Sequence, residues 1–104
     1  MMRRFNSGFQ IFRKARSSDG QGGFSEVWTP QAEIDGRLQA LSMREAPRAM
    51  QDKGVIALRF TCAAGTDLRK GDQVRREGRT VKVDALSETS AGGFIVAICE
   101  EVTP

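Results

Sequence analysis

The chain of 104 residues has no histidine and no tyrosine, and it has only two cysteines. The lack of histidine excludes His-based acid–base catalysis, a Ser-His-Asp triad and a His-liganded metal within this chain. Cys62 and Cys99 alone are too few thiolates for a structural zinc site. The two could pair, but nothing in the sequence suggests export to an oxidising compartment. We therefore expect two reduced thiols in apolar strands.

Long hydrophobic runs are also missing. The longest apolar run covers residues 94–99, far short of the ~20 residues that a membrane helix needs. The first five residues, MMRRF, are basic but lack the apolar stretch of a signal peptide. We expect no membrane partner. Sixteen Lys and Arg against thirteen Asp and Glu leave a net charge of +3, well below the bias of a dedicated polyanion binder.

The length permits one domain, which we assign to residues 1–104 with a basic N-terminal arm at residues 1–8. The loop-like composition of residues 17–23 predicts the tip of a hairpin. Pro30 is expected to end or bend the second arm, because it cannot donate to a strand ladder. Residues 32–40 then alternate with period two, which indicates a separate half-buried strand.

Small residues in that strand, Gly36 and Ala40, predict close packing against another layer or against backbone. Residues 42–54 break the alternation. Ser42 and Glu45 have the spacing of a capping box, and Gly54 fits the end of a helix. Because Pro47 interrupts any helix that starts at Ser42, we expect a short helix or an ordered loop.

The strand at residues 55–62 gives the clearest signal. Four side chains are expected to face the core: Ile56, Leu58, Phe60 and Cys62. Glu77-Gly78 is expected to turn a hairpin, and the inward side chains of its second arm are expected to be Val81, Val83 and Ala85. The last strand, residues 94–102, is apolar on both faces and needs a second packing partner. These patterns predict a mainly β fold: a small antiparallel β-barrel or sandwich of five to six strands with one short helix or ordered loop.

No catalytic constellation is visible in the sequence. Glu100 and Glu101 are adjacent in a strand and point to opposite faces, so they cannot share a proton. The GQGG stretch at residues 20–23 lacks the Lys-Ser/Thr pair that grips phosphate in a P-loop. We expect no catalytic, cofactor-binding or metal-binding residue.

Several short motifs occur in a fixed order over nearly the whole chain: DGQGG at residues 19–23, EVW at 26–28, LSMRE at 41–45, VIALRF at 55–60, GRTVKV at 78–83 and CE at 99–100. In this order and spacing the chain resembles the head-tail joining proteins of tailed bacteriophages, also called head-closure or stopper proteins, and their relatives in gene transfer agents.

The resemblance implies a virion connector that forms a homo-oligomeric ring of six or twelve copies below the portal or adaptor ring. Such a ring closes the DNA channel after packaging and docks the tail terminator or tail tube protein. It implies a location at the neck of the virion, after assembly in the host cytoplasm. The partners would include packaged double-stranded DNA, contacted without sequence specificity.

The family's gate loop matches residues 43–54 of this chain. The candidate channel residues are Met43, Arg44, Arg48, Met50 and Lys53. The N-terminal arm and the two-sided last strand are candidates for subunit or partner contacts. Their interface residues are Phe5, Phe9, Phe12, Phe94, Val96 and Ile98. A ring interface is heterologous, so each subunit needs two different adhesive patches.

The sequence is also compatible with two other functions. The first is a small β-barrel that binds nucleic acid through basic surface patches, such as the cluster of Arg75, Arg76, Arg79 and Lys82. The second is an enzyme with a reactive thiol, which would need an exposed cysteine of lowered pKa. The alternation of its strand predicts that Cys62 faces inward, which argues against a reactive thiol.

Overall fold

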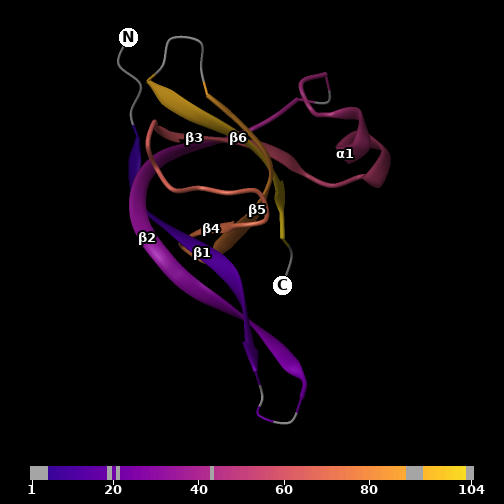
Figure 1. Cartoon of the computed structure of the whole chain (residues 1–104). Coiled ribbons are helices and arrows are strands. Elements are labelled where there is room, and N and C mark those ends of the chain that lie inside the picture. Colours follow the sequence, from indigo (N-terminus) through magenta and orange to yellow (C-terminus); the bar gives the residue numbers. More distant parts are fainter. Residues whose placement is uncertain (1–4, 19, 21, 43, 89–92, 103–104) are drawn as a thin grey trace.

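The computed structural model describes residues 5–18, 20, 22–42, 44–88 and 93–102. Within these residues the chain forms six antiparallel strands and one short helix (Figure 1), in the order β1 (Asn6–Ser18), β2 (Phe24–Ala40), α1 (Arg48–Lys53), β3 (Ala57–Ala63), β4 (Gln73–Arg76), β5 (Arg79–Glu88) and β6 (Phe94–Glu101). The strands lie side by side in the order β1-β2-β3-β6-β5-β4, and β4 closes the barrel onto β1. The predicted fold class is confirmed.

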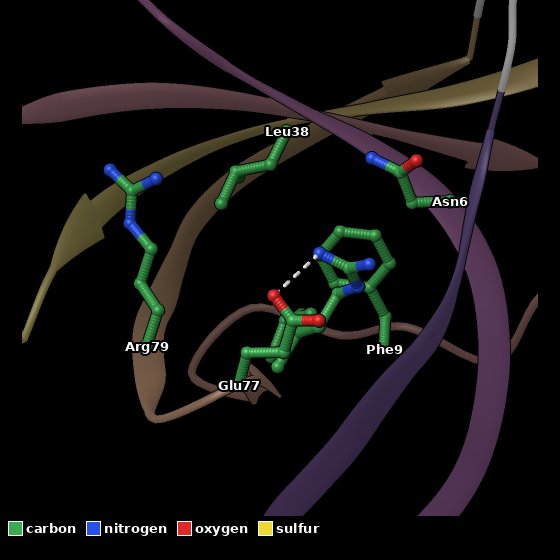
Figure 2. Close-up of a pocket in the computed structure, with 7 residues that line it drawn as sticks. Asn6, Phe9, Leu38, Glu77 and Arg79 are labelled. Carbon is green, nitrogen blue, oxygen red and sulfur yellow. Dashed lines mark hydrogen bonds and ion pairs between the residues drawn. The ribbon is translucent and has the colours of Figure 1, made fainter.

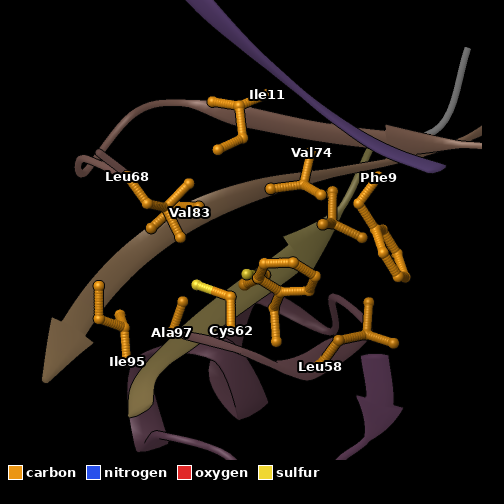
Figure 3. Close-up of a cluster of buried hydrophobic side chains, with 12 residues drawn as sticks. Phe9, Ile11, Leu58, Cys62, Leu68, Val74, Val83, Ile95 and Ala97 are labelled. Atoms are coloured by element: carbon orange, nitrogen blue, oxygen red, sulfur yellow. The ribbon is translucent and has the colours of Figure 1, made fainter. Parts of the chain in front are cut away.

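The barrel encloses an apolar core because alternate side chains of its strands point inward. The core gathers side chains from five of the strands and from the loop before β4 (Figure 3): Phe9, Ile11, Leu58, Phe60, Cys62, Leu68, Val74, Val81, Val83, Ile95, Ala97 and Cys99. Leu58 and Phe60 are at most 1% exposed, and burial of each contributes about 1.5–3 kcal/mol. Both cysteines are free and buried, as expected from their apolar strands.

The predicted close packing at Gly36 is confirmed. Its backbone on β2 lies against the ring of Phe60 on β3, and a Cβ atom at this position would overlap that ring. The Phe60 ring in turn meets Phe9 edge to face, with centroids 5.0 Å apart. Glycine is therefore required here for a close approach rather than for a turn.

The β1–β2 hairpin is longer than the barrel and projects beyond it (Figure 1). The expectation of two strands separated at Pro30 is wrong, because β2 continues through it without interruption. An irregular register between Ile11 and Phe12 of β1 lies opposite Pro30 and absorbs the local distortion. The hairpin makes the molecule elongated, with principal extents of 55 × 31 × 27 Å.

Two details of the predicted strand faces are also wrong. Ile56 precedes β3 and is 57% exposed, so it does not belong to the core. Ala85 is exposed because a β-bulge between Val83 and Ala85 reverses the alternation of β5. The predicted turn at Glu77-Gly78 is confirmed, since both residues have the positive φ, 51° and 78°, of a two-residue hairpin.

Candidate functional site

The segment between β2 and β3 is held at its start by a capping-box pair. The Ser42 amide donates to Glu45 Oε1 and the Glu45 amide donates to Ser42 Oγ, both at 3.3 Å. Arg59 Nη2 of β3 adds a bond of 3.2 Å to Glu45 Oε2. The hydrogen bonds from Ser42, with the charge of Arg59, hold the pKa of Glu45 below its usual value. The pair fixes a turn, and α1 begins only after Pro47.

The helix α1 buries one side chain, and the basic side chains of the helix and of the turn before it are exposed to solvent. Met50 is 5% exposed, so this candidate channel residue points into the protein and not toward a channel. Gly54 ends the helix in the left-handed region at φ 69°. Arg44, Arg48 and Lys53 are exposed and form no ion pair within the part of the chain that the structure describes. The candidate Met43 lies outside the described residues.

The predicted contact residues fall into three places. Phe5 meets Phe94 edge to face at 5.7 Å, and both rings keep exposed surface. Val96 and Ile98 follow Phe94 along the outer face of β6 and are also partly exposed. Phe12 lies on the far side of the barrel.

Phe9 is a correction to the predicted contact set. It is 3% exposed and packs in the core against Phe60, so its ring is not available to a partner. The alternation of β1 places Phe9 and Ile11 on the inward face and Phe12 on the outward face, so the three phenylalanines, grouped by composition, do not share one surface.

The basic cluster at the β4–β5 turn is partly neutralised by nearby carboxylates. Arg79 Nε donates to Glu101 Oε1 at 2.7 Å. Arg76 Nη1 donates to Glu77 Oε2 at 3.3 Å, the contact that is dashed in Figure 2. Arg76, Glu77 and Arg79 line a hollow of about 330 Å³, together with the apolar side chains of Phe9 and Leu38. Arg75 is held by the amide oxygen of Gln73 and not by a carboxylate, so it keeps its positive charge. Because Arg76 and Arg79 are paired with carboxylates, the cluster does not offer a continuous row of cations to a phosphate backbone.

One ion-pair cluster was missed by the sequence reasoning. Arg13 donates through Nε and Nη2 to both carboxylate oxygens of Asp72, at 3.0 and 2.9 Å, and through Nη1 to Asp67 at 3.2 Å. Asp72 is 2% exposed and also accepts the Arg69 amide. The hydrogen bonding of Arg13 to the Asp72 carboxylate is the main cause that raises the pKa of Arg13 above its ordinary value. The cluster fastens the base of the projecting hairpin to the loop before β4.

The two thiols are poor nucleophiles. Burial raises the pKa of Cys99 to about 12, with a further contribution from the charge of Asp84. Burial also raises the pKa of Cys62. Since the thiolate is the reactive species, this environment opposes the reading of the chain as a thiol enzyme.

Two searches of the described residues complete the survey of the site. They contain no group of three or more His, Cys, Asp or Glu placed to hold a metal ion. They likewise include no helix with the length and apolar character needed to span a bilayer.

The fold and these surfaces define a class: a small closed barrel that presents an exposed cationic segment and exposed aromatic side chains to other molecules. The family model of phage head completion proteins matches residues 2–102, and the chain belongs to that family. The family predicted from the sequence is thereby confirmed. It is a family of structural virion proteins and not a known class of enzyme.

Two solved structures share the fold. The solution structure of protein SF1141 from Shigella flexneri 2a has a TM-score of 0.74 at 15% identity, over 94% of this chain and 93% of that chain. A chain in the virion of a native gene transfer agent particle has a TM-score of 0.68 at 18% identity, over 99% of this chain and 100% of that chain. No curated protein matches the sequence.

Proposed function

We propose that the protein is a head-tail connector that forms a ring below the portal or adaptor, closes the DNA channel after packaging and docks the tail. Membership of the phage head completion family supports a structural role in the virion. The neighbours of the ring would be the portal or adaptor above it and the tail terminator or tail tube protein below it. The protein would enter the neck of the particle from the host cytoplasm.

The observation that carries the channel role is the segment between β2 and β3. It leaves the barrel as a fixed turn, carries a short helix anchored by Met50 and returns at β3. Its three exposed cations, Arg44, Arg48 and Lys53, form no salt bridge within the described residues, although the charge of Lys53 acts on Asp84. Such cations are free to contact phosphates, a contact that positions DNA without reading its sequence.

The proposal is tested by deleting the gene from the producing strain and examining the lysate by negative-stain electron microscopy. We expect heads that have lost DNA, lying apart from finished tails. Joined, DNA-filled particles would contradict the proposal, and so would a lysate without heads or tails, because the connector acts after both are built.

The channel contact is tested by complementing that deletion with a triple variant, Arg44→Gln, Arg48→Gln and Lys53→Gln. We expect joined particles that leak DNA, measured as nuclease-sensitive DNA per particle. A matched control removes three other surface cations, with Arg69→Gln, Lys70→Gln and Arg79→Gln, and is expected to retain DNA. Equal DNA retention by the two variants would remove these residues from the channel.

A further inference from the structure

The projecting hairpin carries an exposed surface suited to a protein contact, on the side that faces away from the barrel core. Lys14 and Trp28 are cross-strand partners in the β1–β2 ladder, and Phe12 is two positions from Lys14 on the same face. Arg75 of β4 joins them, because its guanidinium lies over both aromatic rings, 4.0 Å from the Phe12 centroid and 6.0 Å from that of Trp28. We call Phe12, Lys14, Trp28 and Arg75 the hairpin face.

The hairpin face is ordered before any partner arrives. Gln73 Oε1 accepts from Arg75 Nε at 3.0 Å and from Nη2 at 2.7 Å, which fixes the plane of the guanidinium. Lys14 Nζ lies 5.9 Å from the Trp28 centroid and pairs with Glu26 at 2.7 Å. The Lys14–Glu26 pair is solvent-exposed, so Lys14 can exchange Glu26 for a carboxylate of another molecule at little cost in free energy. Aromatic and arginine side chains held rigidly in this way are the usual anchors of protein interfaces.

The outer side of β5 and β6 has the complementary chemistry. Val96 and Ile98 keep partly exposed apolar surface on β6. Asp84 precedes Ala85, the cross-strand partner of Ile98, and Glu100 is two positions from Ile98 on the same face. Burial, the charge of Glu100 and a hydrogen bond between the two side chains raise the pKa of Asp84. Lys82 Nζ lies 3.9 Å from Asp84 Oδ1, and the charge of Lys53 also acts on Asp84. We call Asp84, Val96, Ile98 and Glu100 the β6 face.

The aromatic part of the hairpin face and the apolar part of the β6 face lie on opposite sides of the barrel. In the closed strand order β1-β2-β3-β6-β5-β4, β1 lies three strands from β6 and β2 lies three strands from β5. Arg75 stands on β4, the neighbour of β5, at the edge of the hairpin face. Phe12 and Trp28 therefore cannot cover Val96 and Ile98 of the same molecule. Complementary patches on opposite sides of a subunit produce head-to-tail association, which closes into a ring when the rotation allows it.

We propose that the hairpin face of one copy docks on the β6 face of the next copy, with Lys14 and Arg75 against Asp84 and Glu100. The aromatic rings of the hairpin face then cover Val96 and Ile98. This contact gives the last strand the second packing partner that its two apolar faces require. The inference rests on the proposed function only in that the contact would build the connector ring.

The test is a carbodiimide cross-link, which joins a lysine amine to a carboxylate in direct contact. A concentrated one-to-one mixture of unlabelled and ¹⁵N-labelled chains is treated, digested and analysed by mass spectrometry. We expect mixed-isotope peptides joining Lys14 to Asp84 or Glu100. The intramolecular Lys14–Glu26 link, across 2.7 Å, serves as the internal reference. The reference link without any mixed-isotope link to Asp84 or Glu100 would overturn the inference.

Charge reversal sharpens the test. Arg75→Glu and Glu100→Arg are each expected to abolish the mixed-isotope link, because like charges then face each other. A mixture of the two variants restores complementary pairs and is expected to restore the link. Arg69→Glu is the matched control, since Arg69 is exposed and lies outside both faces. Links that survive both reversals, or that fail to return in the mixture, would reject the pairing of these two faces. The cross-link is read in solution, so a strain that assembles normally without the gene would reject the connector function and leave this result standing.

Discussion

The barrel and its projecting hairpin are built from the same kind of strand but are held by different forces. In the barrel every strand pairs on both sides and lays apolar side chains into one core. The outer half of the hairpin has two strands, with Val27 43% exposed and pairs such as Lys14–Glu26 at its surface. A two-stranded ribbon of this kind is marginal by itself in water.

The difference separates two roles, stability and contacts with other molecules, between two regions of one short chain. The barrel supplies the stability, because Phe9 and Ile11 of β1 pack in its core. Where the hairpin leaves the barrel, Arg13 and Asp72 fix its base. Beyond that anchor, its side chains are free to serve contacts with other molecules. Substitutions should therefore damage folding in the barrel and assembly in the hairpin.

The largest effect is expected from a charge in the barrel core. Leu58→Asp places a carboxylate where the side chain is 1% exposed, and an unpaired buried charge costs several kcal/mol. We expect no cooperative unfolding transition by circular dichroism. Val27→Asp makes a comparable change on the hairpin and should keep the melting transition. A folded Leu58→Asp protein would contradict the division between the two regions.

The next effect is expected at the anchor of the hairpin. Arg13→Gln leaves Asp72 buried without its cation, and breaking a buried pair in this way costs about 3–5 kcal/mol. Urea denaturation measures the loss. Arg69→Gln removes an exposed partner of Asp67 and is expected to cost about 1 kcal/mol or less. Similar losses for the two variants would show that the Arg13 pair does not act as an anchor.

A smaller effect is expected where β2 touches the core. Gly36→Ala forces a methyl group toward the Phe60 ring, and overpacking of this kind costs about 1–3 kcal/mol. Phe60→Leu removes the ring, so the alanine should cost clearly less in that background. A double-mutant cycle by thermal unfolding measures the coupling, and purely additive losses would rule out the contact as the reason for glycine.

The smallest effect is expected when the rates of thiol labelling in the barrel and on the hairpin are compared. With a pKa of about 12 for Cys99, only about one thiol in ten thousand is ionised at pH 8. Because both native cysteines are also buried, we expect them to label only when the barrel opens. A cysteine introduced on the hairpin by Ser25→Cys should label at the rate of a free thiol. Rapid labelling of Cys62 or Cys99 in the folded protein would reopen the reading as a thiol enzyme.

Strand alternation and turn chemistry were enough to predict the β-barrel class, the hairpin at Glu77-Gly78 and the close packing at Gly36. The alternation and the turn depend on neighbours in sequence, so a local pattern records them. At Gly36 the sequence indicated a close contact but not its partner, Phe60 of another strand. The bulge that exposes Ala85 is decided by pairing with another strand. No local pattern reports such a shift.

The site residues divide in the same way. The capping pair of Ser42 and Glu45 was visible because its spacing is local. The Arg13–Asp72 pair joins residues 59 positions apart, and the hairpin face needs Arg75 brought beside β1 by closure of the barrel. Contacts created by closure could not be found before the fold was known.

The most direct test of the central claim, that this protein is the connector between head and tail, is to locate it in the intact particle by cryo-electron microscopy. We predict density for a ring of these barrels at the neck, between portal and tail, with the segment between β2 and β3 turned toward the channel. Barrels spread over the capsid surface, or found at the far end of the tail, would contradict the account.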